Sequence, residues 1–221
     1  MDNELAKEEA ALLFVGGQYM FRWQNENETH SKFVSPAAVR AAFSAEPIDT
    51  GWLLPNVRRW GTGVHGDWAV LSFPPMRHQL TIQRKTKNAL LNIPMPALVF
   101  MRTGSVAYVW AIKGEFSPDA LLYNAPLPNV GSGGGICFGS GNSLEDKNIG
   151  QTWQLFLDSP FTSHHSNGKS QSQPDDVRRL LVSLRGKKRY PLNDLVPLNR
   201  RATVDEMVTK LVYEPEHFFV D

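Results

Sequence analysis

The sequence predicts a single α+β domain, and three observations support this prediction. Short strand-like runs follow one another with no room for crossover helices, which indicates an antiparallel sheet. Helical signals lie before and after these runs rather than between them. Six glycines between positions 131 and 141 predict a loop that separates the sheet from the C-terminal helices. This order of elements is typical of an α+β domain.

Residues 1–50 predict a strand-and-helix extension that packs on the core. The apolar and aromatic run 12–23 contains Gly16-Gly17 at its middle, which favours a strand pair with a tight turn or one bent strand. Ser35 and Pro36 then predict the start of a helix that continues to about Ser44, because serine caps helices and proline fits their first position.

The central part of the chain predicts a four-strand antiparallel meander. Residues 47–66 read mostly as loop, and Pro74-Pro75 should end the first strand because proline donates no ladder hydrogen bond. We expect the flanking helices to pack mainly on one face of the sheet. The four strand-like runs are 68–73, 79–84, 97–101 and 106–112.

The last third of the chain predicts helices of the same domain. Residues 151–157 favour a short helix or strand. Residues 175–185 place apolar side chains at helical spacing, which predicts an amphipathic helix. Thr203 and Glu206 form a capping box, which predicts the start of a final helix.

Composition excludes several classes of protein. The 221 residues are 42% hydrophobic and 20% charged, with 23 basic against 22 acidic side chains, so a disordered chain or a fibre is excluded. The net charge of +1 gives no reason to expect a nucleic-acid partner. No apolar run is long enough to cross a membrane, and the acidic N-terminus does not resemble a signal peptide. We therefore expect a cytoplasmic protein without a membrane partner.

Cys137 is the single cysteine of the sequence. A single cysteine excludes an intrachain disulfide, a four-thiolate zinc site and an iron–sulfur cluster held within one chain. Its spacing to the nearest histidines matches no common zinc pattern, so we expect no metal. The glycine-rich segment lacks the Gly-Lys-Ser/Thr of a phosphate-binding loop, and we expect no cofactor.

The segment from Pro126 to Phe138 predicts cysteine chemistry. Its prolines favour an extended path, its glycines allow close approach of the backbone, and Ile136 and Phe138 can anchor the chain on both sides of the thiol. The amide of Asn129 can donate to a developing oxyanion. A thiol beside an amide donor suits acyl transfer through a thioester. The plainer alternatives are a buried, inert Cys137 and an Asn129 that only forms a turn.

Three further polar residues are candidates for catalytic support. His164 and His165 could act as a base or orient an amine, or they could be solvated loop residues. Asp158 could depress the pKa of an attacking lysine, or it could simply cap a helix. The basic residues of 185–189 fit a solvated helix end, where cations suit the helix dipole, or a surface for an acidic partner.

The loop resembles the signature of ubiquitin-conjugating enzymes. In that signature an asparagine after a proline precedes the active-site cysteine by eight positions, as Asn129 precedes Cys137. The sequence APLPNVGSGGGICFG at 125–139 is most similar to prokaryotic ubiquitin-conjugating-like family D, which includes PRTRC system protein B. The resemblance implies a UBC-like fold with a core at 51–165, an active-site loop at 125–141 and C-terminal helices at 166–221.

The resemblance also implies a function and partners. A ThiF-type activating enzyme would pass a ubiquitin-like protein to Cys137 as a thioester, and an amine on a target would then attack it. A JAB-type peptidase can belong to the same operon, and a role in antiphage defence is one possibility. Leu127 stands where the family has histidine, and Phe138-Gly139 replace the usual Leu-Asp. Two alternatives stay open: a non-catalytic module that binds a ubiquitin-like protein, and a cysteine hydrolase that uses His164 or His165 as its base.

Overall fold

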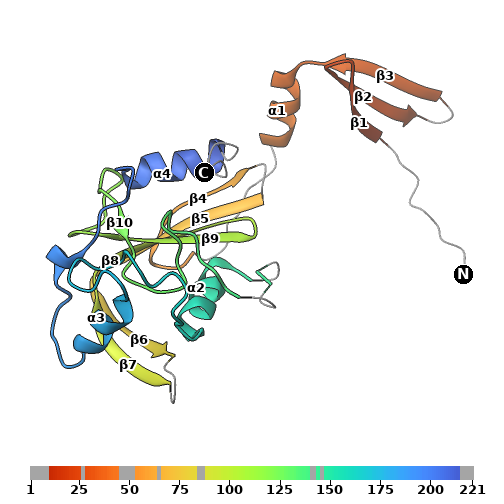
Figure 1. Cartoon of the computed structure of the whole chain (residues 1–221). Helices are drawn as coiled ribbons and strands as arrows, with labels where there is room; N and C mark the ends of the chain where they lie inside the picture. Colours follow the sequence, from red (N-terminus) through yellow and green to blue (C-terminus); the bar gives the residue numbers. More distant parts are fainter. Residues whose placement is uncertain are drawn as a thin grey trace, which may run out of the picture. The chain divides into compact units, whose positions relative to one another are not determined.

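The computed structural model describes residues 10–25, 28–44, 53–63, 66–83, 88–139, 143–144 and 147–214. The chain divides into two units, residues 1–52 and residues 53–221 (Figure 1), which we describe separately. The packing of the first 50 residues on the core therefore stays a prediction. No helix among the described residues is long and apolar enough to cross a membrane.

The first unit is a three-stranded antiparallel sheet followed by a helix. Strands β1 (Ala10–Val15), β2 (Gln18–Asn25) and β3 (Glu28–Val34) pair in sequence order. Gly16 and Gly17 form the first turn with φ angles of 57° and 79°, which confirms the predicted strand pair. Helix α1 (Pro36–Ser44) begins where predicted, and the Ser35 hydroxyl accepts a 3.1 Å hydrogen bond from the Ala38 N–H.

The second unit is built on a five-stranded antiparallel sheet (Figure 1). Its strand order is β10-β9-β8-β5-β4, so four strands form a meander with a short fifth strand at one edge. The fold class is therefore α+β with antiparallel pairing, as the sequence predicts. The strands are β4 (Val57–Gly63), β5 (Gly66–Phe73), β8 (Ala97–Thr103), β9 (Val106–Ile112) and β10 (Tyr123–Asn124).

One strand of the predicted meander was assigned wrongly. The run 79–84 belongs to β6 (Met76–Ile82), which pairs with β7 (Ala89–Met95) in a separate two-stranded sheet. The fourth meander strand is instead β4, in a stretch predicted as loop. Its Gly61 lies against the Trp68 ring, where an added Cβ would come within 2.6 Å of a ring carbon. Glycine is therefore required at this strand position because a side chain would overlap the Trp68 ring, although glycine has a low β-propensity.

The described helices of this unit pack on both faces of the sheet, two on one face and one on the other, so the larger share lies on one face as expected. Alternate side chains of β8 enter two different cores. Leu98 and Phe100 face the core that contains residues of α2 (Ile149–Asp158) and α3 (Val177–Ser183). Val99 and Met101 face the core that contains residues of α4 (Val204–Tyr213). A continuous apolar strand indicates burial on both faces, and this signal lies in the sequence of β8.

The C-terminal helices begin at capping residues. Asn148 and Gln151 form a capping box at the start of α2, which settles the helix-or-strand alternative for 151–157 as a helix. Asp176 caps α3, and Thr203 with Glu206 forms the predicted box at the start of α4. A short 3₁₀ turn at Leu192–Asp194 lies between α3 and α4.

Candidate active site

The predicted active-site loop leaves the edge of the five-stranded sheet directly after β10. Residues 125–130 are buried, and Leu127 is only 1% exposed within the core that α2 and α3 cover. Leucine at the position of the family's histidine is therefore an apolar core residue here, and packing supports the loop at this point.

The glycine-rich segment folds back on itself as a tight hairpin, residues 129–137. Val130 and Ile136 form an antiparallel bridge, and the Gly131 N–H donates to the Gly135 carbonyl over 2.8 Å. The Cys137 N–H donates to the Asn129 carbonyl, also over 2.8 Å. The glycine run thus forms a defined hairpin, held by its own backbone hydrogen bonds.

The hairpin lies along β9. The Val109 N–H donates to the Gly134 carbonyl over 2.9 Å, and the Ile136 N–H donates to the Ala107 carbonyl over 2.8 Å. Gly134 has φ 93°, and a Cβ there would lie 2.2 Å from Nε1 of Trp110. Only glycine fits this position without displacement of the tryptophan.

Cys137 lies at the end of the hairpin, and its side chain is exposed. Its neighbours Ile136 and Phe138 are partly buried and pack against the core. Phe138 makes an edge contact with Phe156 of α2 at 6.3 Å between ring centroids. The backbone of the cysteine is therefore fixed on both sides while the thiol meets solvent.

Asn129 connects the hairpin to the segment that follows α2. Its Nδ2 donates to the Pro160 carbonyl over 3.0 Å, and its Oδ1 accepts from the Thr162 hydroxyl over 2.9 Å. Its N–H donates to the His164 carbonyl over 2.8 Å. The residue is 7% exposed and has φ 60°, a left-handed conformation that asparagine tolerates better than most residues.

The same segment is also bound to the β6–β7 hairpin. The Phe161 N–H donates to the Thr81 carbonyl over 2.8 Å, and the Gln83 N–H donates to the Phe161 carbonyl over 2.9 Å. Segment 160–164 therefore lies between β6 and Asn129 and bonds to both.

The structure brings three of the predicted site residues together through the backbone. The N–H of Cys137 donates a hydrogen bond to the carbonyl of Asn129, and the N–H of Asn129 donates one to the carbonyl of His164. The rings of His164 and His165 lie 3.8 Å apart, and both residues are exposed. Desolvation lowers the pKa of His165, with smaller contributions from the charges of His164 and Lys169. Among these described residues, no hydrogen bond joins the Cys137 thiol to either histidine.

Asp158 lies apart from this chain of bonds. It is exposed at the end of α2, where its carboxylate accepts a 2.9 Å hydrogen bond from Gln154. It lies two positions before Pro160, whose carbonyl accepts from Asn129.

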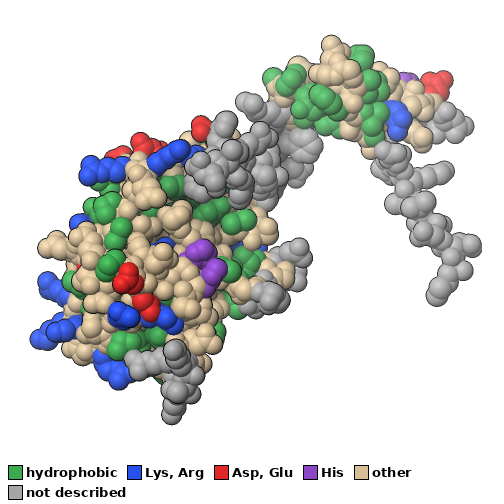
Figure 2. Space-filling model, in the orientation of Figure 1, with side chains coloured by type: hydrophobic (Ala, Val, Ile, Leu, Met, Phe, Trp, Pro, Cys, Tyr) green, Lys and Arg blue, Asp and Glu red, His purple; other side chains and the backbone are tan. Residues whose placement is uncertain are grey.

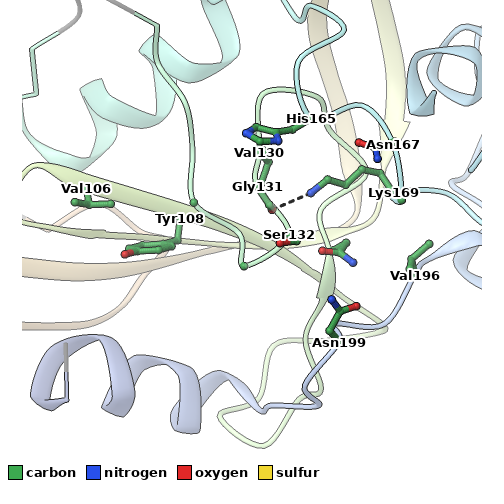
Figure 3. A pocket seen from close by; sticks show the side chains of 14 residues that line it. Val106, Tyr108, Val130, Gly131, Ser132, His165, Asn167, Lys169, Val196 and Asn199 are labelled. Atoms are coloured by element: carbon green, nitrogen blue, oxygen red, sulfur yellow. Dashed lines mark hydrogen bonds between the residues drawn. The ribbon is translucent and has the colours of Figure 1, made fainter. Parts of the chain in front are cut away.

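The sequence reasoning missed Lys169. This lysine is 2% exposed, and its Nζ donates to the Gly131 carbonyl over 3.0 Å (Figure 3). Burial lowers its pKa to about 8. A single lysine within a polar loop gives no sequence signal of burial, so the pattern could not have identified it.

Basic side chains gather on the surface around α3 and the segment that follows it (Figure 2). Residues 185, 187, 188 and 189 are all exposed. Within the described ranges, no group of three or more His, Cys, Asp or Glu residues could hold a metal ion.

Comparison with protein families gives a match that covers the cysteine loop. The model of prokaryotic E2 family D matches residues 30–198, which include the hairpin, segment 160–164 and Lys169. No significant match was found among curated proteins or solved structures. The match covers well over half of the chain and the whole of the cysteine loop, and the chain therefore belongs to prokaryotic E2 family D, a family with a ubiquitin-conjugating-like role.

Proposed function

We propose that this protein is a conjugating transferase that carries a ubiquitin-like protein as a thioester on Cys137. The observation that supports it best is an exposed thiol on a backbone fixed at both sides. Such a thiol can accept a bulky acyl group without rearrangement of its own loop, and correct positioning is a large part of catalysis.

The proposed reaction has two acyl transfers. First, Sγ of Cys137 attacks the carbonyl carbon of the modifier's C-terminal thioester on a ThiF-type activating enzyme. The C–S bond to that enzyme breaks, and its sulfur takes up the proton that Cys137 gives up. An amine of the target then attacks the new thioester, a C–N bond forms, a base takes up the proton that the amine releases, and the Cys137 sulfur leaves as a thiolate.

We assign Asn129 to the positioning of the loop and retain a contact with the oxyanion as the second part of the proposal. Its amide group bonds to Pro160 and Thr162, and these bonds support the positioning role. An oxyanion contact would require Nδ2 to exchange its Pro160 partner for the reacting carbonyl.

His164 and His165 are proposed to accept the proton of the attacking amine. Both are exposed, and the lowered pKa of His165 favours its neutral form, which a base requires. Asp158 is proposed as a weaker candidate that would act on the amine of the target. A hydrolase that uses Cys137 with a histidine base has less support, because it requires a thiol–imidazole contact.

A reconstituted transfer assay tests this function. The protein is incubated with its activating enzyme, its modifier and ATP, and gels are run with and without a thiol reductant. The expected product is an adduct that the reductant removes, that Cys137→Ala abolishes and that Cys137→Ser replaces with a reductant-stable ester. An adduct that forms on Cys137→Ala would contradict the proposal. A JAB-type peptidase, if one is encoded nearby, should cleave the modifier from its target.

A further inference from the structure

A cavity of about 720 Å³ lies beside the glycine hairpin (Figure 3). Its walls come from the hairpin, from Val106 and Tyr108 of β9, from residues 165 and 167–169, and from the segment that contains Val196 and Asn199. Cys137 is not among its lining residues, although Gly131 and Ser132 of the same hairpin are. The cavity is therefore separate from the thiol.

Lys169 places a nearly buried cation in the wall of this cavity. Its ammonium group has three N–H donors, and Gly131 accepts one of them. Among the described residues, Lys169 forms no salt bridge with a carboxylate. A buried charge is costly unless it is paired, so this ammonium favours an anion from outside the chain.

The wall of the same cavity also contains Asn124, whose side-chain oxygen has no partner in the described part of the chain. It is 6% exposed, and its Nδ2 donates to the Pro197 carbonyl over 3.2 Å. Its Oδ1 is buried and has no hydrogen-bond partner within the part of the chain that the structure describes. Buried acceptors are normally satisfied, so a ligand of this cavity should present a donor as well as an anion.

Two backbone donors of the hairpin are already used by the hairpin itself. The N–H groups of Gly131 and Gly134 are both used within the hairpin, by the carbonyls of Gly135 and Gly131. The other side chain in the wall that can become a cation is His165, and desolvation lowers its pKa, which favours the neutral form. A single cation in the wall suits a singly charged carboxylate better than a doubly charged phosphate.

We propose that this cavity binds the carboxyl-terminal end of a peptide. The terminal carboxylate pairs with Lys169, a peptide N–H donates to Asn124 Oδ1, and an apolar side chain packs on Val106, Val130 and Val196. The volume lies in the range of sites for ligands of several hundred daltons, which favours a peptide end over a small carboxylate. A modifier held as a thioester has no free carboxylate, so this ligand is distinct from the acyl group on Cys137.

Calorimetric titration of the full chain tests the proposal without any conjugation enzyme. The probes are N-acetyl-Ala-Ala-Val with a free carboxylate, the same peptide as its C-terminal amide, sodium propionate and inorganic phosphate. The expected order is tightest binding by the free acid, with the amide about tenfold weaker or more because it lacks the charge. Affinity should also fall about tenfold from pH 7.5 to pH 9.5, as Lys169 loses its proton.

Two variants make the result specific. Lys169→Met removes the charge with little change of volume and should abolish the preference for the acid over the amide. Lys188→Met removes an exposed lysine outside the cavity and should bind as the wild type does. Thermal melts of both variants verify that they fold.

Four results would each overturn the proposal. They are equal binding of acid and amide, tighter binding of phosphate or propionate, unchanged binding by Lys169→Met, and no binding of any probe at millimolar concentration. None of these results depends on the thioester assay.

Discussion

The N–H of Cys137 donates a 2.8 Å hydrogen bond to the carbonyl oxygen of Asn129, eight positions earlier in the chain. This hydrogen bond closes the glycine hairpin and places Cys137, with its exposed thiol, beside the buried Asn129, whose backbone has a left-handed conformation. The characteristic spacing of the two residues thus corresponds to a direct backbone contact.

Cys137→Ser and Cys137→Ala should leave the stability of the fold nearly unchanged. The side chain is exposed, and the hydrogen bond that holds this position comes from the backbone. Surface substitutions of this kind usually change the free energy of unfolding by less than about 0.5 kcal/mol. Urea denaturation measures this directly. A large loss of stability would show that the thiol has a structural contact, and the transfer assay could then not be interpreted through chemistry alone.

Asn129→Ala should reduce stability by about 1–3 kcal/mol, because the polar groups of Pro160 and Thr162 lose their partner. Asn129→Gly is the matched variant, since it also removes the side chain but accepts the φ of 60° without strain. Both should discharge a preformed thioester to a free amine more slowly. If stability is unchanged while single-turnover discharge falls by about 10²–10³, an oxyanion contact is the main role of Asn129.

Gly134→Ala should destabilise the protein more than Gly139→Ala. Both glycines have positive φ, 93° and 77°, so alanine introduces backbone strain of about 1 kcal/mol at either position. At Gly134 the new Cβ would also overlap Trp110, whereas at Gly139 it would meet no atom within 4 Å. The difference between the two variants in the free energy of unfolding therefore isolates the contact with Trp110. Equal effects would contradict this geometry.

Stability should rise between pH 8 and pH 10.5, relative to a Lys169→Met variant. The pKa of Lys169 is about 8 in the folded state against 10.5 in the absence of burial, so the unfolded chain binds the extra proton in this window. The full difference between these two pKa values corresponds to about 3 kcal/mol in the free energy of unfolding. Denaturation at pH 7 and at pH 10 measures the change, with Lys188→Met as the control that should retain the rise. A wild-type protein without this rise would contradict the burial of an unpaired ammonium.

The sequence predicted the elements that local chemistry determines. Glycines at 16 and 17 predicted a turn, the Thr203–Glu206 box predicted a helix start, and the glycine run predicted the loop that contains Cys137. Each of these signals depends on residues close together in the chain, where capping, turn and spacing rules are strong.

The features that were missed depend on contacts between distant residues. The place of β4 in the sheet depends on the close approach of Gly61 to Trp68. Strand β6 lies outside the meander because it pairs with β7. The burial of Lys169 depends on Gly131, which lies 38 positions earlier. Local propensity and periodicity contain no information about such pairs, so a sequence pattern could not place them.

The two-sided attachment of segment 160–164 determines how the cysteine loop can move. Phe161 bonds to β6, and Asn129 bonds to Pro160 and Thr162 on either side of it. Opening of the glycine hairpin at Asn129 must therefore break side-chain hydrogen bonds to segment 160–164, which hydrogen bonds to β6 already hold in place. Segment 160–164 and the neighbouring β6–β7 sheet thus hold the cysteine loop in place, although its glycine content alone would predict a flexible loop.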